Sequence, residues 1–298
     1  ESRVRGGHNF NRLTFDTKQV YSNDGKIDLL VALDTNTVNK HKKKLKNKNK
    51  IIHIEKSSNA YLAGFLVKYF GIDFKYLKKQ LKEEKNSEKN IEDAKKGYEE
   101  GDISFKILKE YKNKTSNNKK FNILDGSQGV SIGALKSGLK IYYAYPMTPA
   151  TPVLTELAQM QLDNKNKHLV LELENEISVA NAGVGSCMTG EKTMVGTSGG
   201  GLDLMGETFS LCGMAEIPLV FYLAQRPGPG TGVATYTSQG DLKQALGIGH
   251  GEFPRFVLAP GDPIEAQEIT NQVFYLTQKT QTPGIIVSDK HLGEAKYT

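Results

Sequence analysis

The spacing of apolar residues divides the second half of the chain into alternating strands and helices. Apolar runs of strand length predict strands at Lys140–Tyr145, His168–Leu173, Thr193–Thr197, Leu219–Leu223, Phe256–Ala259 and Gly284–Ser288. Apolar residues at three- and four-residue steps predict helices between them, at Val153–Leu162, Asn175–Met188, Leu202–Cys212, Asp241–Gly247 and Pro263–Thr277. This alternation predicts an α/β fold with a doubly wound parallel sheet over residues 121–298. Ligands of such sheets bind beyond the carboxyl ends of the strands.

A weaker version of the same pattern covers residues 1–85, which we interpret as a partial α/β domain. Ile27–Leu33 and Ile51–Ile54 predict two strands. Asn59–Phe70 predicts an amphipathic helix that packs on their sheet, with Gly71 at the position where helices often end. Residues 86–120 are rich in Lys, Glu and Asn, and we interpret them as a charged helical linker.

The length and the hydropathy limit the class of protein. A chain of 298 residues can form two domains. It has no apolar run of the ~18 residues that a membrane-spanning helix needs, so we expect a cytoplasmic protein without membrane contact. The chain begins at Glu1 with a polar, basic segment and no initiator methionine, which predicts an incomplete or processed N-terminus.

The net charge of +6 permits nucleic-acid binding. Much of the excess lies in a Lys- and Asn-rich run at residues 39–50, which has no Arg and no aromatic residue. Phosphate clamps favour Arg, and readers of single strands need stacking aromatics, so a solvated helix end and loop is favoured over a nucleic-acid patch. A basic surface that steers an acidic electron carrier or partner subunit is a third interpretation.

The sequence contains two cysteines, Cys187 and Cys212, without the spacing of a metal or cluster site. We predict two buried, reduced thiols and no metal site on this chain. Any iron–sulfur cluster would come from a partner.

Two candidate ligand-binding positions follow the first two predicted strands of the sheet. Thr148 lies in a proline-stiffened turn beside a helix N-terminus, which suits a carboxylate or phosphate; the alternative is that Thr148 only caps the turn. Glu174 and Glu176 follow the next strand, where a helix that starts at Asn175 would turn Glu176 inward over the sheet. The alternative is that these acids only compensate the helix dipole.

Later strands end in glycine-rich loops. Ser198–Gly201 either lets main-chain atoms approach a ligand or forms a tight turn. Arg226 opens the loop QRPGPGTG, where a guanidinium fork suits a small carboxylate. His250 in GHGEFPR is either a proton shuttle or, as we favour, a loop anchor.

From about Phe121 to its end, the chain closely resembles the alpha subunit of 2-oxoacid:ferredoxin oxidoreductases, in their 2-oxoglutarate-like branch. The resemblance rests on the order of YPMTPAT, LENEIS, GTSGGGLDLM, AEIPLV, QRPGPGTG, SQGDLKQAL, GHGEFPR, VLAPGD and TPGIIVSDKHL. In residues 1–84, SRVRGGHNF and KIDLLVALD resemble the gamma domain often fused ahead of alpha. The usual glycine-rich start of that domain and the domains that usually follow alpha's first domain are missing, which predicts a fragment or a shortened member.

The resemblance implies a thiamine-diphosphate-binding, pyrimidine-type domain with a transketolase-like fold. It places Glu176 on the aminopyrimidine ring, where it promotes activation of the thiazolium carbon. Thr148 and Arg226 match the pair that holds the substrate carboxylate. Ser198, Gly199 and Gly200 would line the cofactor pocket with backbone groups.

The resemblance also implies partners. A separate beta subunit would bind the diphosphate, Mg²⁺ and a [4Fe-4S] cluster, within an alpha2beta2 assembly. Ferredoxin would accept the electrons, and coenzyme A would take the acyl group formed from the 2-oxoacid. The alternatives are an indolepyruvate oxidoreductase, a dehydrogenase E1 component, or a non-catalytic basic scaffold that docks a partner through Lys40–Lys50.

Three small differences from the family pattern lie close to these positions. Met147 replaces the usual Ile, and Gly200 replaces the Pro that usually follows Thr-Ser-Gly. Gly126–Gly129 replaces a glycine–asparagine turn. None of the three removes a charged group.

Overall fold

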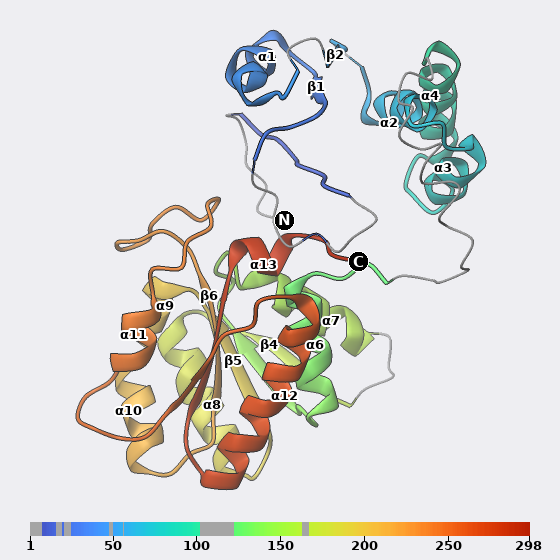
Figure 1. Ribbon diagram of the computed structural model, residues 1–298. Helices are drawn as coiled ribbons and strands as arrows, with labels where there is room; N and C mark the ends of the chain where they lie inside the picture. Colours follow the sequence, from blue (N-terminus) through green and yellow to red (C-terminus); the bar gives the residue numbers. More distant parts are fainter. Residues whose placement is uncertain are drawn as a thin grey trace. The chain divides into compact units, whose positions relative to one another are not determined.

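The computed structural model describes residues 8–15, 20, 25–47, 50–55, 57–101, 122–162 and 167–298. The chain forms two compact units, which separate between Lys120 and Phe121 and are treated individually below (Figure 1). Among the described residues, no helix combines the length and the apolar composition that crossing a membrane requires.

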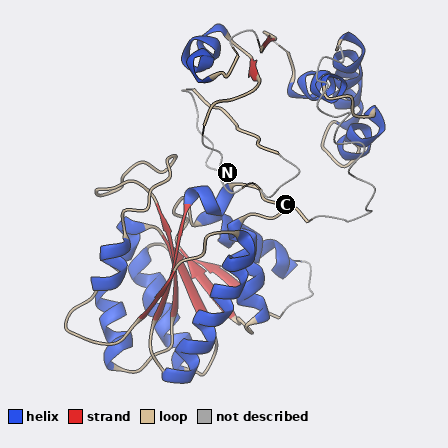
Figure 2. Ribbon diagram, viewed as in Figure 1, coloured by secondary structure: helices blue, strands red, loops and turns tan. Residues whose placement is uncertain are grey.

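The C-terminal unit is built on a six-stranded parallel sheet with the order β4-β3-β5-β6-β8-β7. Its strands are β3 (Ile141–Ala144), β4 (Leu169–Glu172), β5 (Thr193–Thr197), β6 (Val220–Gln225), β7 (Phe256–Leu258) and β8 (Gly284–Asp289). Helices cover both faces of the sheet (Figure 2). These helices are α6 (Gly126–Lys136), α7 (Thr151–Leu162), α8 (Glu176–Met188), α9 (Gly199–Leu204), α10 (Gly206–Met214), α11 (Leu242–Gly247), α12 (Pro263–Thr280) and α13 (Lys290–Glu294). The predicted doubly wound α/β fold is confirmed.

Two apolar cores lie on opposite faces of this sheet. One contains buried side chains of α6, α7 and α12 together with Tyr142 and Tyr222 from the strands. The other contains side chains of α8, α9, α10 and α11 together with Val195 and Phe221. Because successive side chains of a strand point to opposite faces, the neighbours Phe221 and Tyr222 belong to different cores. Burial on both faces explains why the central strands are continuous apolar runs.

Two parts of the helix prediction are wrong. The stretch Leu202–Cys212 is not one helix, because α9 ends and α10 begins around Met205, next to the poor helix former Gly206. Helix α6 was not predicted, since its start was interpreted as the turn Gly126–Gly129. Glycine has low helix propensity, so this helix depends on its cap and on tertiary packing.

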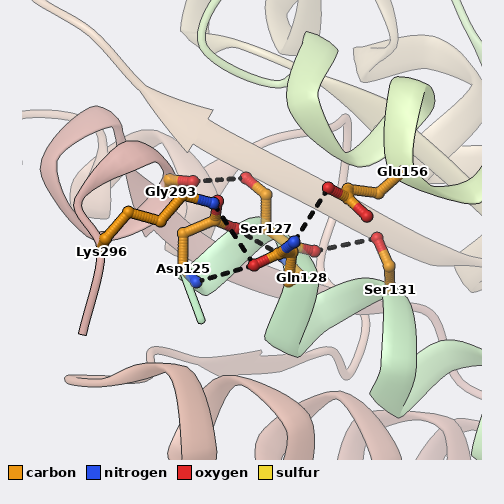
Figure 3. A network of polar contacts seen from close by, with 7 residues as sticks. All are labelled: Asp125, Ser127, Gln128, Ser131, Glu156, Gly293 and Lys296. Carbon is orange, nitrogen blue, oxygen red and sulfur yellow. Dashed lines mark hydrogen bonds and ion pairs between the residues drawn. The ribbon is translucent and has the colours of Figure 1, made fainter. Parts of the chain in front are cut away.

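The cap of α6 is a network of polar contacts (Figure 3). The Asp125 carboxylate accepts a hydrogen bond from the Gln128 amide, while the Gln128 side chain accepts one from the Asp125 amide. Lys296 pairs with Asp125 at 2.6 Å, and the Gln128 side-chain amide donates to Glu156 of α7. The network therefore joins α6, α7 and the C-terminal segment.

The glycines of α6 allow it to pack closely on α12. A β-carbon at Gly129 would lie 2.2 Å from the carbonyl oxygen of Pro263, and one at Gly133 would lie 2.5 Å from that of Gln267. Real β-carbons do not approach backbone atoms so closely, so these positions require glycine. Gly129 and Gly133 thus have a packing role.

In the N-terminal unit, β1 (Leu30–Ala32) pairs in parallel with β2 (Ile51–His53), as the sequence predicts. The basic run forms the end of α1 (Thr35–His41) and the 3-10 helix η1 (Lys42–Lys44), and its described lysines are exposed. The predicted helix end and loop are therefore found at this run.

Helix α2 (Asn59–Tyr69) packs against α3 (Phe74–Leu81) and α4 (Ser87–Glu100). The prediction that it packs on the sheet is wrong. Glycines again allow the close approach: a β-carbon at Gly64 would lie 1.8 Å from the Ala94 carbonyl oxygen.

Part of the predicted 86–120 linker forms a packed helix, α4, while residues 102–120 lie outside the described part of the chain. The division into residues 1–85, 86–120 and 121–298 stays a prediction.

We expect Gly133→Ala to lower the free energy of unfolding of the C-terminal unit by about 1 to 3 kcal/mol, because its methyl group overlaps α12. Gly185→Ala in α8 is the matched control, since a β-carbon there meets open space and helix propensity favours Ala. Urea unfolding of the full chain, followed by far-UV circular dichroism, measures both. Equal unfolding midpoints for the two variants would contradict the packing role.

Candidate active site

Four parallel strands bring the predicted site residues to one edge of the sheet. Thr148 follows β3, Glu176 follows β4, Ser198–Gly201 follows β5 and Arg226 follows β6. These strands are neighbours in the order β4-β3-β5-β6, so their carboxyl ends lie side by side (Figure 1). The site is therefore assembled from distant segments of the chain: Arg226 and Thr148, which are joined by a hydrogen bond, lie 78 positions apart.

Glu176 is the first residue of α8 and its carboxylate is buried, with 3% of the residue exposed. The Asn175 side chain caps the helix by accepting a hydrogen bond from the Ser178 amide, which turns Glu176 inward as predicted. Among the residues that the structure describes, none forms a hydrogen bond with the buried Oε1 atom of Glu176. A buried acceptor without a donor is costly, so this atom indicates a ligand that donates to it.

Glu174 differs from Glu176 although it lies only two positions earlier. It is exposed and accepts a hydrogen bond from the Ser178 hydroxyl at 2.5 Å, which lowers the pKa of its carboxyl group. Compensation of the helix dipole can account for an exposed acid near a helix start, but it does not require the burial of Glu176. Of these two acids, Glu176 is the one whose carboxylate is suited to face a buried ligand.

The start of α9 closes over Glu176. A β-carbon at Gly201 would lie 2.8 Å from Oε1 of Glu176 and 2.0 Å from the Thr197 hydroxyl. The Thr197 hydroxyl in turn contacts the sulfur of Met147 at 3.9 Å. Sequence reasoning did not single out Thr197, whose only signal is its position as the last residue of a predicted strand. The third glycine of the triplet is thus required by close packing on the buried acid.

Arg226 is also buried, with 8% exposed, and its Nη1 atom donates to the Thr148 carbonyl oxygen at 2.6 Å. Burial lowers the pKa of this guanidinium, while the negative charge of Glu176 raises it. Arginine remains protonated in either case. The structure therefore brings Thr148, Glu176 and Arg226 together, with the Thr148 contact made by its backbone carbonyl.

Ser198, Gly199 and Gly200 lie on the same edge of the sheet. Ser198 is fully buried, and its hydroxyl has no hydrogen-bond partner within the described part of the chain. Gly200 lies under the loop after β6, since a β-carbon there would be 2.9 Å from the Gly230 carbonyl oxygen. Gly199 lies beside Asp241, whose pKa is raised by burial and by the neighbouring charge of Asp203. Asp241 is a further polar group near the site that sequence reasoning treated only as a helix start.

His250 lies apart from these residues. It is exposed in a groove of about 1040 Å³ between α10, α11 and the following turn, and none of Thr148, Glu176 and Arg226 lines that groove. The His250 amide donates to the Ser210 hydroxyl at 2.5 Å. This contact is made by the backbone, so the role of the His250 imidazole stays a prediction.

Both cysteines are buried and free, as predicted. Burial raises the pKa of Cys187 to about 11 and that of Cys212 to about 12. Within the described residues, no group of three or more His, Cys, Asp or Glu side chains could hold a metal ion.

The fold and the site define a doubly wound α/β domain with a buried, unpaired acid and a buried guanidinium at the ligand-binding edge of its sheet. Residues 132–298 match the family model described as pyruvate flavodoxin/ferredoxin oxidoreductase, thiamine diP-bdg. The match covers more than half of the chain, which therefore belongs to this family.

Curated relatives agree with this assignment. A 2-oxoacid:ferredoxin oxidoreductase subunit alpha from Saccharolobus solfataricus is 38% identical over 190 residues, covering 60% of this chain and 30% of the relative. A protein of the same name from a Sulfolobus species is 28% identical over 376 residues, covering 100% of this chain and 60% of the relative. A 2-oxoglutarate synthase subunit KorA from Archaeoglobus fulgidus is 32% identical over 174 residues, covering 58% of this chain and 50% of the relative. The chain thus spans less than two thirds of the length of these relatives.

A solved structure shares the fold. It is a 2-oxoglutarate:ferredoxin oxidoreductase from Magnetococcus marinus with 2-oxoglutarate, coenzyme A and succinyl-CoA bound. The TM-score is 0.76 at 24% sequence identity, and the match covers 93% of this chain and 55% of that chain.

We expect neither cysteine to react with iodoacetamide at pH 8 in the folded chain. The thiolate is the reactive form, and a pKa raised to about 11 or 12 keeps both thiols protonated at that pH. Labelling should become fast only in guanidinium chloride, as followed by mass spectrometry. Rapid alkylation of either folded thiol would contradict the structure.

Proposed function

We propose that this chain is the alpha-type part of a 2-oxoacid:ferredoxin oxidoreductase, which oxidatively decarboxylates a 2-oxoacid to an acyl-CoA and passes the electrons to ferredoxin. The observation that carries the proposal is the buried, unpaired Oε1 of Glu176 beside the buried guanidinium of Arg226. Family membership and the names of the alpha-subunit relatives support the same assignment.

The residues at this edge fit thiamine diphosphate. The ring of its aminopyrimidine carries a nitrogen that can donate a hydrogen bond when protonated, and the orphaned Oε1 of Glu176 is a buried acceptor of the required kind. Gly201 leaves space for this carboxylate, and the buried hydroxyl of Ser198 is a second polar group without a partner. When bound, the cofactor supplies the carbon nucleophile that attacks the 2-oxo group and the electron sink for decarboxylation. Glu176 would hold the proton on the pyrimidine ring.

Arg226 and Thr148 would hold the substrate carboxylate. A guanidinium carries five N–H donors, so the hydrogen bond from Nη1 to Thr148 leaves donors for a carboxylate. That hydrogen bond also fixes the plane of the guanidinium, and burial strengthens its interaction with an anion. The position of the carboxylate would in turn orient the 2-oxo carbon.

We propose 2-oxoglutarate as the preferred substrate. The order of the QRPGPGTG and GHGEFPR loops resembles the 2-oxoglutarate-like branch, and several relatives are named 2-oxoglutarate synthase subunit KorA.

A beta-type subunit would complete the enzyme in an alpha2beta2 assembly. It would bind the diphosphate, Mg²⁺ and a [4Fe-4S] cluster, because the two buried, protonated thiols of this chain are unsuited to bind iron. The free thiols agree with a cytoplasmic location. We propose that residues 1–85 form a partial gamma-type domain and that 121–298 form the pyrimidine-binding domain. Residues 86–120 would be a charged helical linker, although its helix α4 packs on α2.

The complex with the beta-type subunit should reduce ferredoxin with 2-oxoglutarate and coenzyme A, and Glu176→Gln should lower its turnover by at least ~100-fold. The amide keeps the shape of the side chain but removes the charge that holds the ring proton. Glu174→Gln is the matched control and should retain turnover, because this acid is exposed. The proposal fails if Glu176→Gln retains turnover near that of the unmodified complex, or if the complex uses lipoamide in place of ferredoxin.

We expect Arg226→Ala to raise KM for the 2-oxoacid and to lower kcat/KM by ~10- to 100-fold, through the loss of one charged contact to the substrate carboxylate. Arg255→Ala is the control, because Arg255 is another guanidinium whose pKa is lowered by burial, and it lies against Phe209 and Phe253. Steady-state kinetics of the complex measures both variants. An unchanged KM for Arg226→Ala would place the substrate carboxylate elsewhere.

A further inference from the structure

The loop from Arg226 to Gly240 connects β6 to α11 and carries Arg226 at its first position. Most of its residues are exposed, and Gly230 and Gly232 both adopt a φ of +64°, in the left-handed region. Its internal backbone hydrogen bonds include those from Val233 to Pro227 and from Tyr236 to Val233. So exposed and glycine-rich a loop needs contacts with the sheet to hold one conformation.

Those contacts are made by Asp289, the last residue of β8. Its carboxylate accepts a hydrogen bond from the Thr237 hydroxyl at 3.1 Å and from the Gln239 side-chain amide at 2.8 Å. Thr237 also accepts a hydrogen bond from the His291 amide. Asp289 is itself buried, with 7% exposed, and it accepts from the Leu292 amide at the start of α13. The returning arm of the loop is therefore attached to a fixed, charged acceptor.

The first residues of the Arg226–Gly240 loop also lie beside Asp289. Asp289 is the register partner of Gln225, the residue that precedes Arg226. The Gln225 side chain donates to the Ser288 carbonyl oxygen and accepts from the Asp241 amide. Both ends of the loop are thus fixed at the carboxyl ends of β6 and β8, and between them the loop contacts the site where Gly230 lies against Gly200.

From these contacts, we propose that Asp289 is a positioning residue, which acts through Thr237 and Gln239 to hold the Arg226–Gly240 loop closed over the substrate-carboxylate site. The role of that site rests on the function proposed above. Release of the returning arm lets the loop leave Gly200 and lets water reach Arg226. Substrate then binds only to the closed fraction, so its apparent affinity falls in proportion to that fraction.

The cleanest test removes the loop side of the contacts. Thr237 and Gln239 are both exposed, so Thr237→Val/Gln239→Ala leaves the cores and the hydrogen bond from the Leu292 amide to Asp289 intact, while it also removes the acceptor of the His291 amide. In the complex with the beta-type subunit, we expect KM for 2-oxoglutarate to rise about 10-fold with kcat nearly unchanged, as expected for the loss of two hydrogen bonds. The Val233 and Tyr236 amides should exchange with deuterium about 10-fold faster.

Variants of the carboxylate separate this role from helix capping. Asp289→Ala removes the loop contacts and the α13 cap, and should raise KM and loop exchange at least as much. Asp289→Asn should restore both to within about 3-fold, because Asn keeps an acceptor for Thr237 and is a good cap. Asp262→Ala is the matched control: Asp262 caps α12 by accepting from the Ile264 and Glu265 amides, and it has no loop partner among the described contacts. It should leave KM and loop exchange unchanged.

The proposal requires both readouts to change together. Unchanged KM and exchange in Thr237→Val/Gln239→Ala would overturn it, as would a change in one without the other. If the unmodified complex oxidises no 2-oxoacid, the proposed function fails, while faster loop exchange in this variant still reports the attachment to Asp289.

Discussion

The candidate site depends on two buried groups of opposite charge at the carboxyl edge of the sheet. Glu176 and Arg226 are both almost fully buried, yet Glu176 keeps an oxygen without a partner. Burial of charged groups opposes folding unless other groups compensate for the lost water. The Arg226 hydrogen bond to Thr148 and the charge of Glu176 supply part of this compensation. The remaining unpaired acceptor marks the position where a ligand completes the site.

The surrounding scaffold explains how such a site stays in place. Parallel strands fix the backbone positions of the site residues, and side chains at the strand ends then fix the loops. The Gln225 side-chain amide donates to the Ser288 carbonyl oxygen, and the Asp289 carboxylate accepts from the Gln239 side-chain amide, where regular secondary structure has ended. The functional side chains are therefore positioned by rigid strands and helices, while the Arg226–Gly240 loop lies beside the site.

Glycine has the same physical role at several distant positions. At Gly64, Gly133 and Gly201 there is no room for a β-carbon, because a backbone oxygen or a polar side chain occupies that space. At Gly64 and Gly133 the result is close helix packing, while at Gly201 it is the closing of α9 over Glu176. The glycines of helix α6 permit close packing and do not form a turn, which is why the turn interpretation of Gly126–Gly129 was wrong and helix α6 was not predicted.

The sequence alone determined the strands and the edge of the sheet at which the site lies. Buried parallel strands require continuous apolar runs, and the residues that follow them reach one edge whatever the details of packing. The tertiary structure decided which side chains are buried and which loops are held in place, because the local sequence pattern does not fix either. Glu174 and Glu176 differ in burial because one helix cap turns the second inward. Asp289 holds the loop through Thr237, which lies 52 residues earlier in the chain. Helix α6 and the packing of α2 on α4 likewise depend on contacts between distant backbones, and the periodicity of side chains carries no information about them.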